Sequence, residues 1–137
     1  MRIGDVMSRD VCVISPSTSM QDAARRMAER DIGCLPVGEN DRLVGMVTDR
    51  DMVLRGISEG RSADSPVGEV MTPEVKYCFE DEDVDEVAAN MAGLEKRRLP
   101  VLDRDMRLVG IVSLANFAHS RDDEASQELL RGVARPH

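Results

Sequence analysis

The stretch LVGMVTDRD occupies residues 43–51, and a closely similar stretch, LVGIVSLAN, occupies residues 108–116. In each, a short apolar run with one glycine ends at a hydroxyl residue and passes into a segment with helix-forming capacity. Short apolar runs of this kind are typical of buried strands. The stretch therefore predicts a strand followed directly by a helix, and its return predicts two copies of one fold.

The junction between this strand and this helix is the first candidate binding site. Backbone N–H groups at a helix start lack intrahelical partners, so the turn is expected to present free donors for an anion, above all phosphate. Thr48 ends the predicted strand and Asp51 follows three residues later. A carboxylate there can accept two hydrogen bonds from a vicinal diol such as a ribose. The alternative is that Thr48 and Asp51 only cap the helix.

Length and charge restrict the class of protein. The 137 residues suffice for one compact domain or two small lobes, and 42% of them are hydrophobic. The net charge of −8 disfavours binding to nucleic acid or to an anionic membrane surface. No apolar run approaches the ~20 residues of a membrane span, and the N-terminus lacks the apolar core of a signal peptide. We therefore expect a cytoplasmic protein.

The residues most often found in metal and catalytic centres are few and scattered. Cys12, Cys34 and Cys78 are odd in number and have no CxxC spacing, and each lies in an apolar run where a small buried side chain is expected. His119 and His137 have no partner at ligand spacing. The sequence thus predicts no catalytic residue, no metal site and no required cofactor.

An internal repeat extends well beyond the opening stretch. Placing each residue over the one 64 positions later aligns GDVMS (residues 4–8) with GEVMT (68–72), and CLPV (34–37) with RLPV (98–101). The offset becomes 65 at the second LVG stretch. Each half also carries a helix whose apolar residues recur at helical intervals. Those faces are Met20, Ala23, Ala24, Met27 and Ala28, and Val84, Val87, Ala88, Met91 and Ala92.

Each half is therefore predicted to fold as β-α-β-β-α, with strands at 11–14 and 75–79 preceding the helices. The predicted division is repeat 1 at residues 1–57, a linker at 58–66, repeat 2 at 67–118, and a tail at 119–137 with a short helix. A sheet with helices on one face leaves its other face uncovered, so the two repeats are expected to pack sheet to sheet about a pseudo-twofold axis. A ligand is expected in a cleft between them.

With both LPV and both LVG motifs in place, residues 3–118 resemble a tandem pair of CBS (cystathionine-β-synthase) domains. The resemblance implies an α+β fold of two such repeats and a regulatory module without enzymatic activity. It implies an adenosyl effector, namely AMP, ADP, ATP, NAD or S-adenosylmethionine, and a homodimer. The chain is too short for the catalytic barrel of the dehydrogenase that some relatives regulate.

The resemblance also assigns a stronger ligand site. Asp51 is expected to bind the ribose, Arg98 to reach the phosphate from the other repeat, and Ile111 to close the apolar slot. A basic run such as residues 96–98 is otherwise read as a solvated face. The stronger site comprises Ile32, Gly33, Pro36, Thr48, Asp51, Arg98 and Ile111.

A second, weaker site is expected at Ser113 and Asn116. The hydroxyl is kept there, but Asn116 offers one neutral acceptor where Asp51 offers two charged ones. The two sites are therefore predicted to be unequal. Besides a metabolic sensor, the sequence leaves open an interaction module that binds no small molecule and serves dimerisation or an unknown protein partner.

Overall fold

A computed structural model of the chain describes residues 1–94 and 98–113, and it has the predicted α+β composition. The chain divides into two compact units. Unit 1 comprises residues 1–11 and 76–137, and unit 2 comprises residues 12–75. Each unit has its own hydrophobic core.

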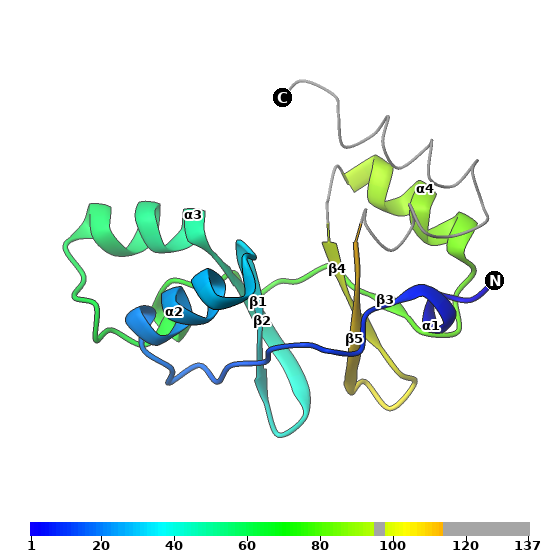
Figure 1. Cartoon of the computed structure of the whole chain (residues 1–137), viewed down its shortest axis with the longest axis horizontal. Coiled ribbons are helices and arrows are strands. Elements are labelled where there is room, and N and C mark those ends of the chain that lie inside the picture. Colours follow the sequence, from blue (N-terminus) through cyan, green and yellow to red (C-terminus); the bar gives the residue numbers. More distant parts are fainter. Residues whose placement is uncertain (95–97, 114–137) are drawn as a thin grey trace. The chain divides into compact units, whose positions relative to one another are not determined.

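Unit 2 contains α2 (Met20–Arg30) and an antiparallel hairpin of β1 (Cys34–Glu39) and β2 (Arg42–Thr48). The chain leaves β2 through α3 (Asp49–Asp51), which continues as a π-helix, η1 (Met52–Gly56), and a 3₁₀ turn, η2 (Ile57–Glu59) (Figure 1). A further 3₁₀ turn, η3, spans Val67–Glu69. The predicted strand at residues 11–14 is reduced to one bridge, between Ile14 and Val37.

The start of α2 is capped by a side chain. Ser19 is the N-cap, and its hydroxyl accepts the N–H of Asp22 at 3.1 Å. Thr18 and Gln21 have the spacing that predicts a capping box, but this prediction is wrong, because the Thr18 hydroxyl lies before the helix and accepts the N–H of Ser15. Met20, Ala23 and Met27 of α2 are buried in the core of unit 2.

Unit 1 contains α1 (Ile3–Val6), β3 (Cys78–Phe79), α4 (Val84–Leu94), β4 (Arg98–Leu102) and β5 (Leu108–Ser113). Its sheet has the order β3-β4-β5. The predicted strand at 75–79 is confined to its last two residues. The predicted second helix of this repeat and the predicted tail helix lie outside the described residues.

The two hairpins are built alike. Each has an antiparallel register that is interrupted by one irregularity, between Val37 and Gly38 in β1 and at the repeat-equivalent place in β4. They differ at their tips. Two residues with positive φ, Asn40 and Asp41, join β1 to β2, whereas residues 103–107 join β4 to β5.

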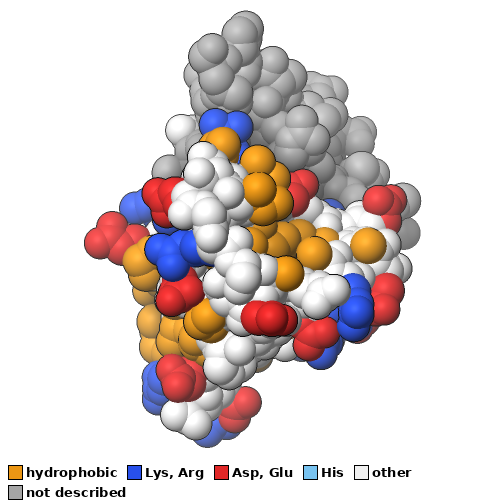
Figure 2. All heavy atoms as spheres, turned by 90° about the vertical axis from the view of Figure 1, so that its left-hand side faces the viewer, with side chains coloured by type: hydrophobic (Ala, Val, Ile, Leu, Met, Phe, Trp, Pro, Cys, Tyr) orange, Lys and Arg blue, Asp and Glu red, His pale blue; other side chains and the backbone are white. Residues whose placement is uncertain are grey.

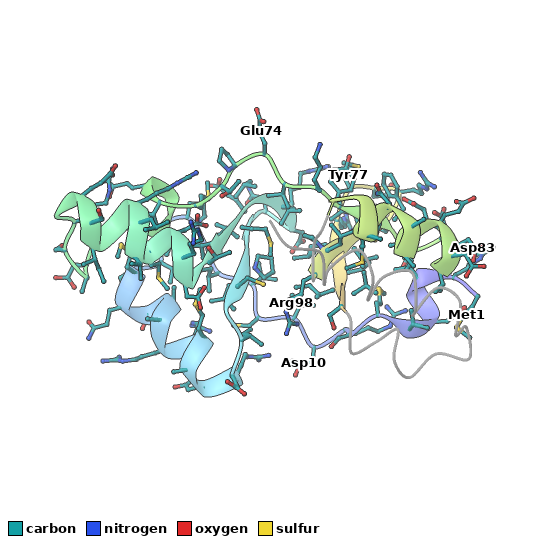
Figure 3. All side chains as sticks on the ribbon, turned by 90° about the horizontal axis from the view of Figure 1, so that it is seen from above. Met1, Asp10, Glu74, Tyr77, Asp83 and Arg98 are labelled. Carbon is teal, nitrogen blue, oxygen red and sulfur yellow. The ribbon has the colours of Figure 1, made fainter. Side chains whose placement is uncertain are left out.

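The first segment of each sequence repeat packs in the compact unit that holds most of the other repeat. Ser8 exchanges two backbone hydrogen bonds of 2.8 and 2.9 Å with Ile111, and Thr72 exchanges the equivalent pair of 2.8 and 3.0 Å with Met46. Figure 3 shows Met1 beside Asp83 at the start of α4, in agreement with the hydrogen bond from the N–H of Val84 to the carbonyl of Met1. The predicted boundaries thus follow the sequence repeat, while the compact units contain exchanged segments.

The glycine of each LVG stretch makes this contact sterically feasible. A Cβ on Gly45 would lie 2.9 Å from the carbonyl oxygen of Thr72, and one on Gly110 would lie 2.9 Å from that of Ser8. Real Cβ atoms essentially never approach backbone oxygen so closely. Glycine at these two positions therefore lets the exchanged segments lie directly against the strands.

Candidate functional site

Five residues of the predicted stronger site lie together in unit 2. Ile32 and Gly33 form the connection from α2 to β1, Pro36 is buried in β1, and Thr48 and Asp51 lie where β2 passes into α3. The backbone N–H of Asp49 donates to the carbonyl of Gly33 at 3.0 Å. This hydrogen bond ties the connection before β1 to the turn after β2, so the predicted adenine and ribose segments are neighbours.

Thr48 and Asp51 form a reciprocal capping box. The Thr48 hydroxyl accepts the N–H of Asp51 at 3.0 Å, and Oδ2 of Asp51 accepts the N–H of Thr48 at 3.1 Å. Both side chains are half-buried. Among the described residues Oδ1 of Asp51 has no hydrogen-bond partner, so the carboxylate keeps acceptor capacity for a ligand while it caps the helix. The capping interpretation and the binding interpretation are therefore compatible.

The expectation of free N–H groups at this turn is wrong. The N–H groups of Thr48 and Asp51 bond within the capping box, and that of Asp49 bonds to Gly33. The N–H of Arg50 donates to Oδ1 of Asp49 at 2.8 Å, and that of Met52 donates to the carbonyl of Asp49. Because the chain's own groups accept all five donors, this turn presents no free backbone N–H for a phosphate.

Asp49 lies at the candidate site although the sequence pattern does not single it out. Its carboxylate lies against Gly33, where a Cβ would be 3.1 Å from Oδ2 of Asp49 and 3.4 Å from its Cγ. Both residues are exposed. Gly33 thus leaves room for the Asp49 carboxylate beside the predicted adenine segment. The spacing from Thr48 predicts a role for Asp51. No sequence pattern predicts one for Asp49, because its position beside Gly33 depends on the fold.

The remaining predicted residues lie in unit 1 or outside the described residues. Arg98 is the exposed first residue of β4, labelled in Figure 3, and it faces Ser113 in the strand register. Ile111 is 9% exposed and its backbone bonds to Ser8. Ser113 is buried. Asn116 lies outside the described residues, so its predicted role stays a prediction.

The cysteines differ in environment. Cys78 is buried, and burial, with a smaller contribution from the Glu82 charge, raises the pKa of its thiol to about 12. Cys12 and Cys34 are half-buried. Within residues 1–94 and 98–113, no three His, Cys, Asp or Glu side chains are placed to hold a metal ion. The helices of the same residues include none with the length and apolar character needed to cross a membrane.

Comparisons with known proteins agree with the fold and the repeat. A family model described as "CBS domain" matches residues 3–56 and 67–122. The CBS domain-containing protein YhcV of Bacillus subtilis is 38% identical over 133 residues, which cover 96% of this chain and 94% of that protein. The structure of CBSX2 in complex with AMP is similar with a TM-score of 0.74 and 31% identity, over 85% of this chain and 93% of that one.

A second solved structure is the CBS domain pair of protein MJ0100 in complex with 5′-methylthioadenosine and S-adenosyl-L-methionine. Its TM-score is 0.74 at 28% identity, and the match covers 86% of this chain and 97% of that one. The ligands in these two structures share an adenosyl group and differ at its 5′ position. One of them carries a phosphate there and the others carry sulfur.

Proposed function

The chain belongs to the CBS domain family, and from that membership we propose that it is a cytoplasmic, non-catalytic regulatory module that binds an adenosyl effector. Domain pairs of this family that bind AMP, methylthioadenosine or S-adenosylmethionine point to a regulatory ligand-binding module. Such a module acts by binding its effector with different affinity in two conformations, which shifts the equilibrium between them.

The capping box carries this proposal. Asp51 is fixed by its bond to the N–H of Thr48, and its Oδ1 stays available to accept from a ribose hydroxyl. Gly33 is held beside it by the bond from Asp49, so an adenine that packs on Ile32 and Pro36 would place its ribose near this carboxylate. The roles of Arg98 and Ile111, and of Ser113 with Asn116 at the weaker site, stay predictions from the family resemblance.

Replacing Asp51 with asparagine is expected to weaken adenosine binding at least tenfold. Asparagine keeps an oxygen for the N–H of Thr48 but loses the charge, and a hydrogen bond to a charged group contributes about 1.5–3 kcal/mol. Because a ligand that binds only the folded state raises the melting temperature, a thermal-shift titration with adenosine measures the change.

The matched control is Asp5→Asn. Asp5 makes the carboxylate half of this arrangement in α1, where its Oδ2 accepts the N–H of Arg2 at 3.1 Å while the N–H of Asp5 donates to the backbone carbonyl of Arg2. Asp5→Asn should lower the melting temperature of the free protein slightly, as Asp51→Asn should. It should leave the adenosine-induced shift in melting temperature unchanged. If wild type shows no shift with adenosine, AMP, ATP, NAD or S-adenosylmethionine, the ligand-binding function is wrong.

An exposed apolar helix face supports the second candidate function, dimerisation, which is compatible with ligand binding. Val53, Leu54 and Ile57 are 52%, 49% and 67% exposed, and they lie within five consecutive residues of η1 and η2. Figure 2 looks onto the end of unit 2 where α2 begins, and apolar side chains reach the surface there.

The internal repeat gives an independent argument for a partner at unit 2. Ala24 and Ala28 of α2 are exposed, whereas the repeat-equivalent Ala88 and Ala92 of α4 are buried. Equivalent small apolar residues are thus covered in one unit and uncovered in the other. A second copy of the chain is the proposed cover, because twofold homodimers are the commonest assemblies of soluble proteins.

Replacing Ile57 with glutamate is therefore expected to convert a dimer into a monomer. Burying two like charges at a twofold contact costs several kcal/mol, which is enough to dissociate a micromolar dimer. Sedimentation velocity measures the mass of both proteins. The control is Met106→Glu, which changes an exposed apolar residue between β4 and β5 and should leave the dimer intact. A monomeric wild type, or a dimeric Ile57→Glu, would rule out this surface.

A further inference from the structure

We propose that Asp49 makes the site select against phosphate, so that the effector is an adenosyl compound with an uncharged or cationic group at its 5′ position. The inference rests on the proposed function, because it concerns which adenosyl ligand the same site accepts. It assigns a role in specificity to a residue that lies between Thr48 and Asp51, the two residues that first indicated the site.

The first observation is the position of the Asp49 carboxylate. It lies on Gly33, with the three carboxylate atoms between 3.1 and 3.5 Å from the place where a Gly33 side chain would begin. Gly33 belongs to the segment proposed to line the adenine, and Asp51 of the same helical turn is proposed to hold the ribose. Asp49 and Asp51 belong to one helical turn, so a ribose held by Asp51 keeps its 5′ group within the electrostatic range of the Asp49 carboxylate.

The second observation is that the turn has no backbone donor to offer. A phosphate at the start of a helix is normally bound by N–H groups that lack intrahelical partners. Here the five N–H groups from Thr48 to Met52 are already accepted by the chain, two of them by carboxylates. A phosphate would have to displace an Asp carboxylate to reach the N–H of Thr48 or that of Arg50.

The third observation is the local charge. Residues 48–51 carry two carboxylates and one guanidinium, and neither Asp49 nor Asp51 takes part in an ion pair with any residue the structure describes. A phosphate would add negative charge near two carboxylates that form no ion pair, and nearby like charges repel each other. A neutral 5′ hydroxyl avoids this repulsion, and a cationic sulfonium is attracted instead.

The test compares adenosine, AMP and S-adenosylmethionine by titration calorimetry with wild type and Asp49→Asn. Wild type should bind adenosine and S-adenosylmethionine at least tenfold more tightly than AMP. Asp49→Asn should strengthen AMP binding about tenfold and leave adenosine binding nearly unchanged. Asp22→Asn is the matched control, because it removes an exposed first-turn carboxylate at the start of α2 and should change none of the three affinities.

Ionic strength separates this electrostatic role from a structural one. Added salt screens the repulsion, so AMP binding to wild type should strengthen with salt, and this dependence should shrink in Asp49→Asn. A packing effect of the substitution would not change the salt dependence.

Three results would overturn the proposal. The first is AMP binding to wild type that is as tight as adenosine binding, and the second is an AMP affinity that Asp49→Asn leaves unchanged. The third is a wild-type preference for AMP that Arg98→Gln removes, because that would show a phosphate held by Arg98. Binding of adenosine together with any of these refutes the selectivity alone, whereas failure of all three ligands to bind refutes the proposed function itself.

Discussion

Gly45→Ala is expected to lower the free energy of unfolding by about 2–3 kcal/mol, in the upper part of the range for overpacked cores. The added methyl would lie 2.7 Å from Sδ of Met71 and 2.9 Å from the carbonyl oxygen of Thr72. The methionine can rotate away, but the Thr72 backbone is held by hydrogen bonds to Met46 in both directions. The exchanged segment must therefore shift or the strand must bend.

Urea unfolding followed by circular dichroism measures this loss, and Gly110→Ala should behave alike because Ser8 occupies the equivalent position. Gly93→Ala is the control. A Cβ at Gly93 meets nothing within 4 Å in α4, and alanine is the better helix former by about 1 kcal/mol, so this variant should be more stable than wild type. Equal stability of Gly45→Ala and wild type would mean that the segment does not lie against β2.

Two fragments of nearly equal length are expected to differ sharply in folding. Residues 12–75 contain the whole of unit 2, whereas residues 1–66 contain sequence repeat 1 with its linker. The second fragment lacks Val67 and Val70, which are fully buried in the core of unit 2. Burial of each valine contributes about 1.5–3 kcal/mol, and a domain of this size has only about 3–5 kcal/mol in total.

Fragment 12–75 should therefore unfold cooperatively in urea, and fragment 1–66 should show weak helical circular dichroism and no cooperative transition. The shorter fragment also keeps the hydrogen bonds from Val67 to Thr18 and from Gly68 to Pro16. A more stable fragment 1–66 would show that the sequence repeat, and not the compact unit, is the folding unit.

The repeated sequence was sufficient to predict the fold class, because the apolar periodicity of α2 and α4 and the hairpin strands are local signals. The exchange of the first segments was not predictable in the same way. GDVMS and GEVMT are so similar that either would fit against Gly45 or Gly110. Which segment packs against which glycine therefore cannot be read from the repeat itself.

The Thr48 turn was located correctly, but its hydrogen bonding was not predicted. Three of its N–H groups are accepted by side chains of the TDRD sequence, and the spacing of Thr48 and Asp51 suggested only the two bonds of the capping pair. The acceptor for Asp49 is the carbonyl of Gly33, sixteen residues earlier. That contact depends on how β1 and β2 pair, and so does the place of the Asp49 carboxylate.

The two hairpin tips differ by one residue when the repeats are aligned. The offset between the repeats changes from 64 to 65 across the tips, so the second repeat has one residue more at this place than the first. Both hairpins kept the same register and the same irregularity on either side of it. Changes in loop length are tolerated at exposed tips, so these tips are the places where a reporter peptide can be grafted without displacing the Thr48 turn.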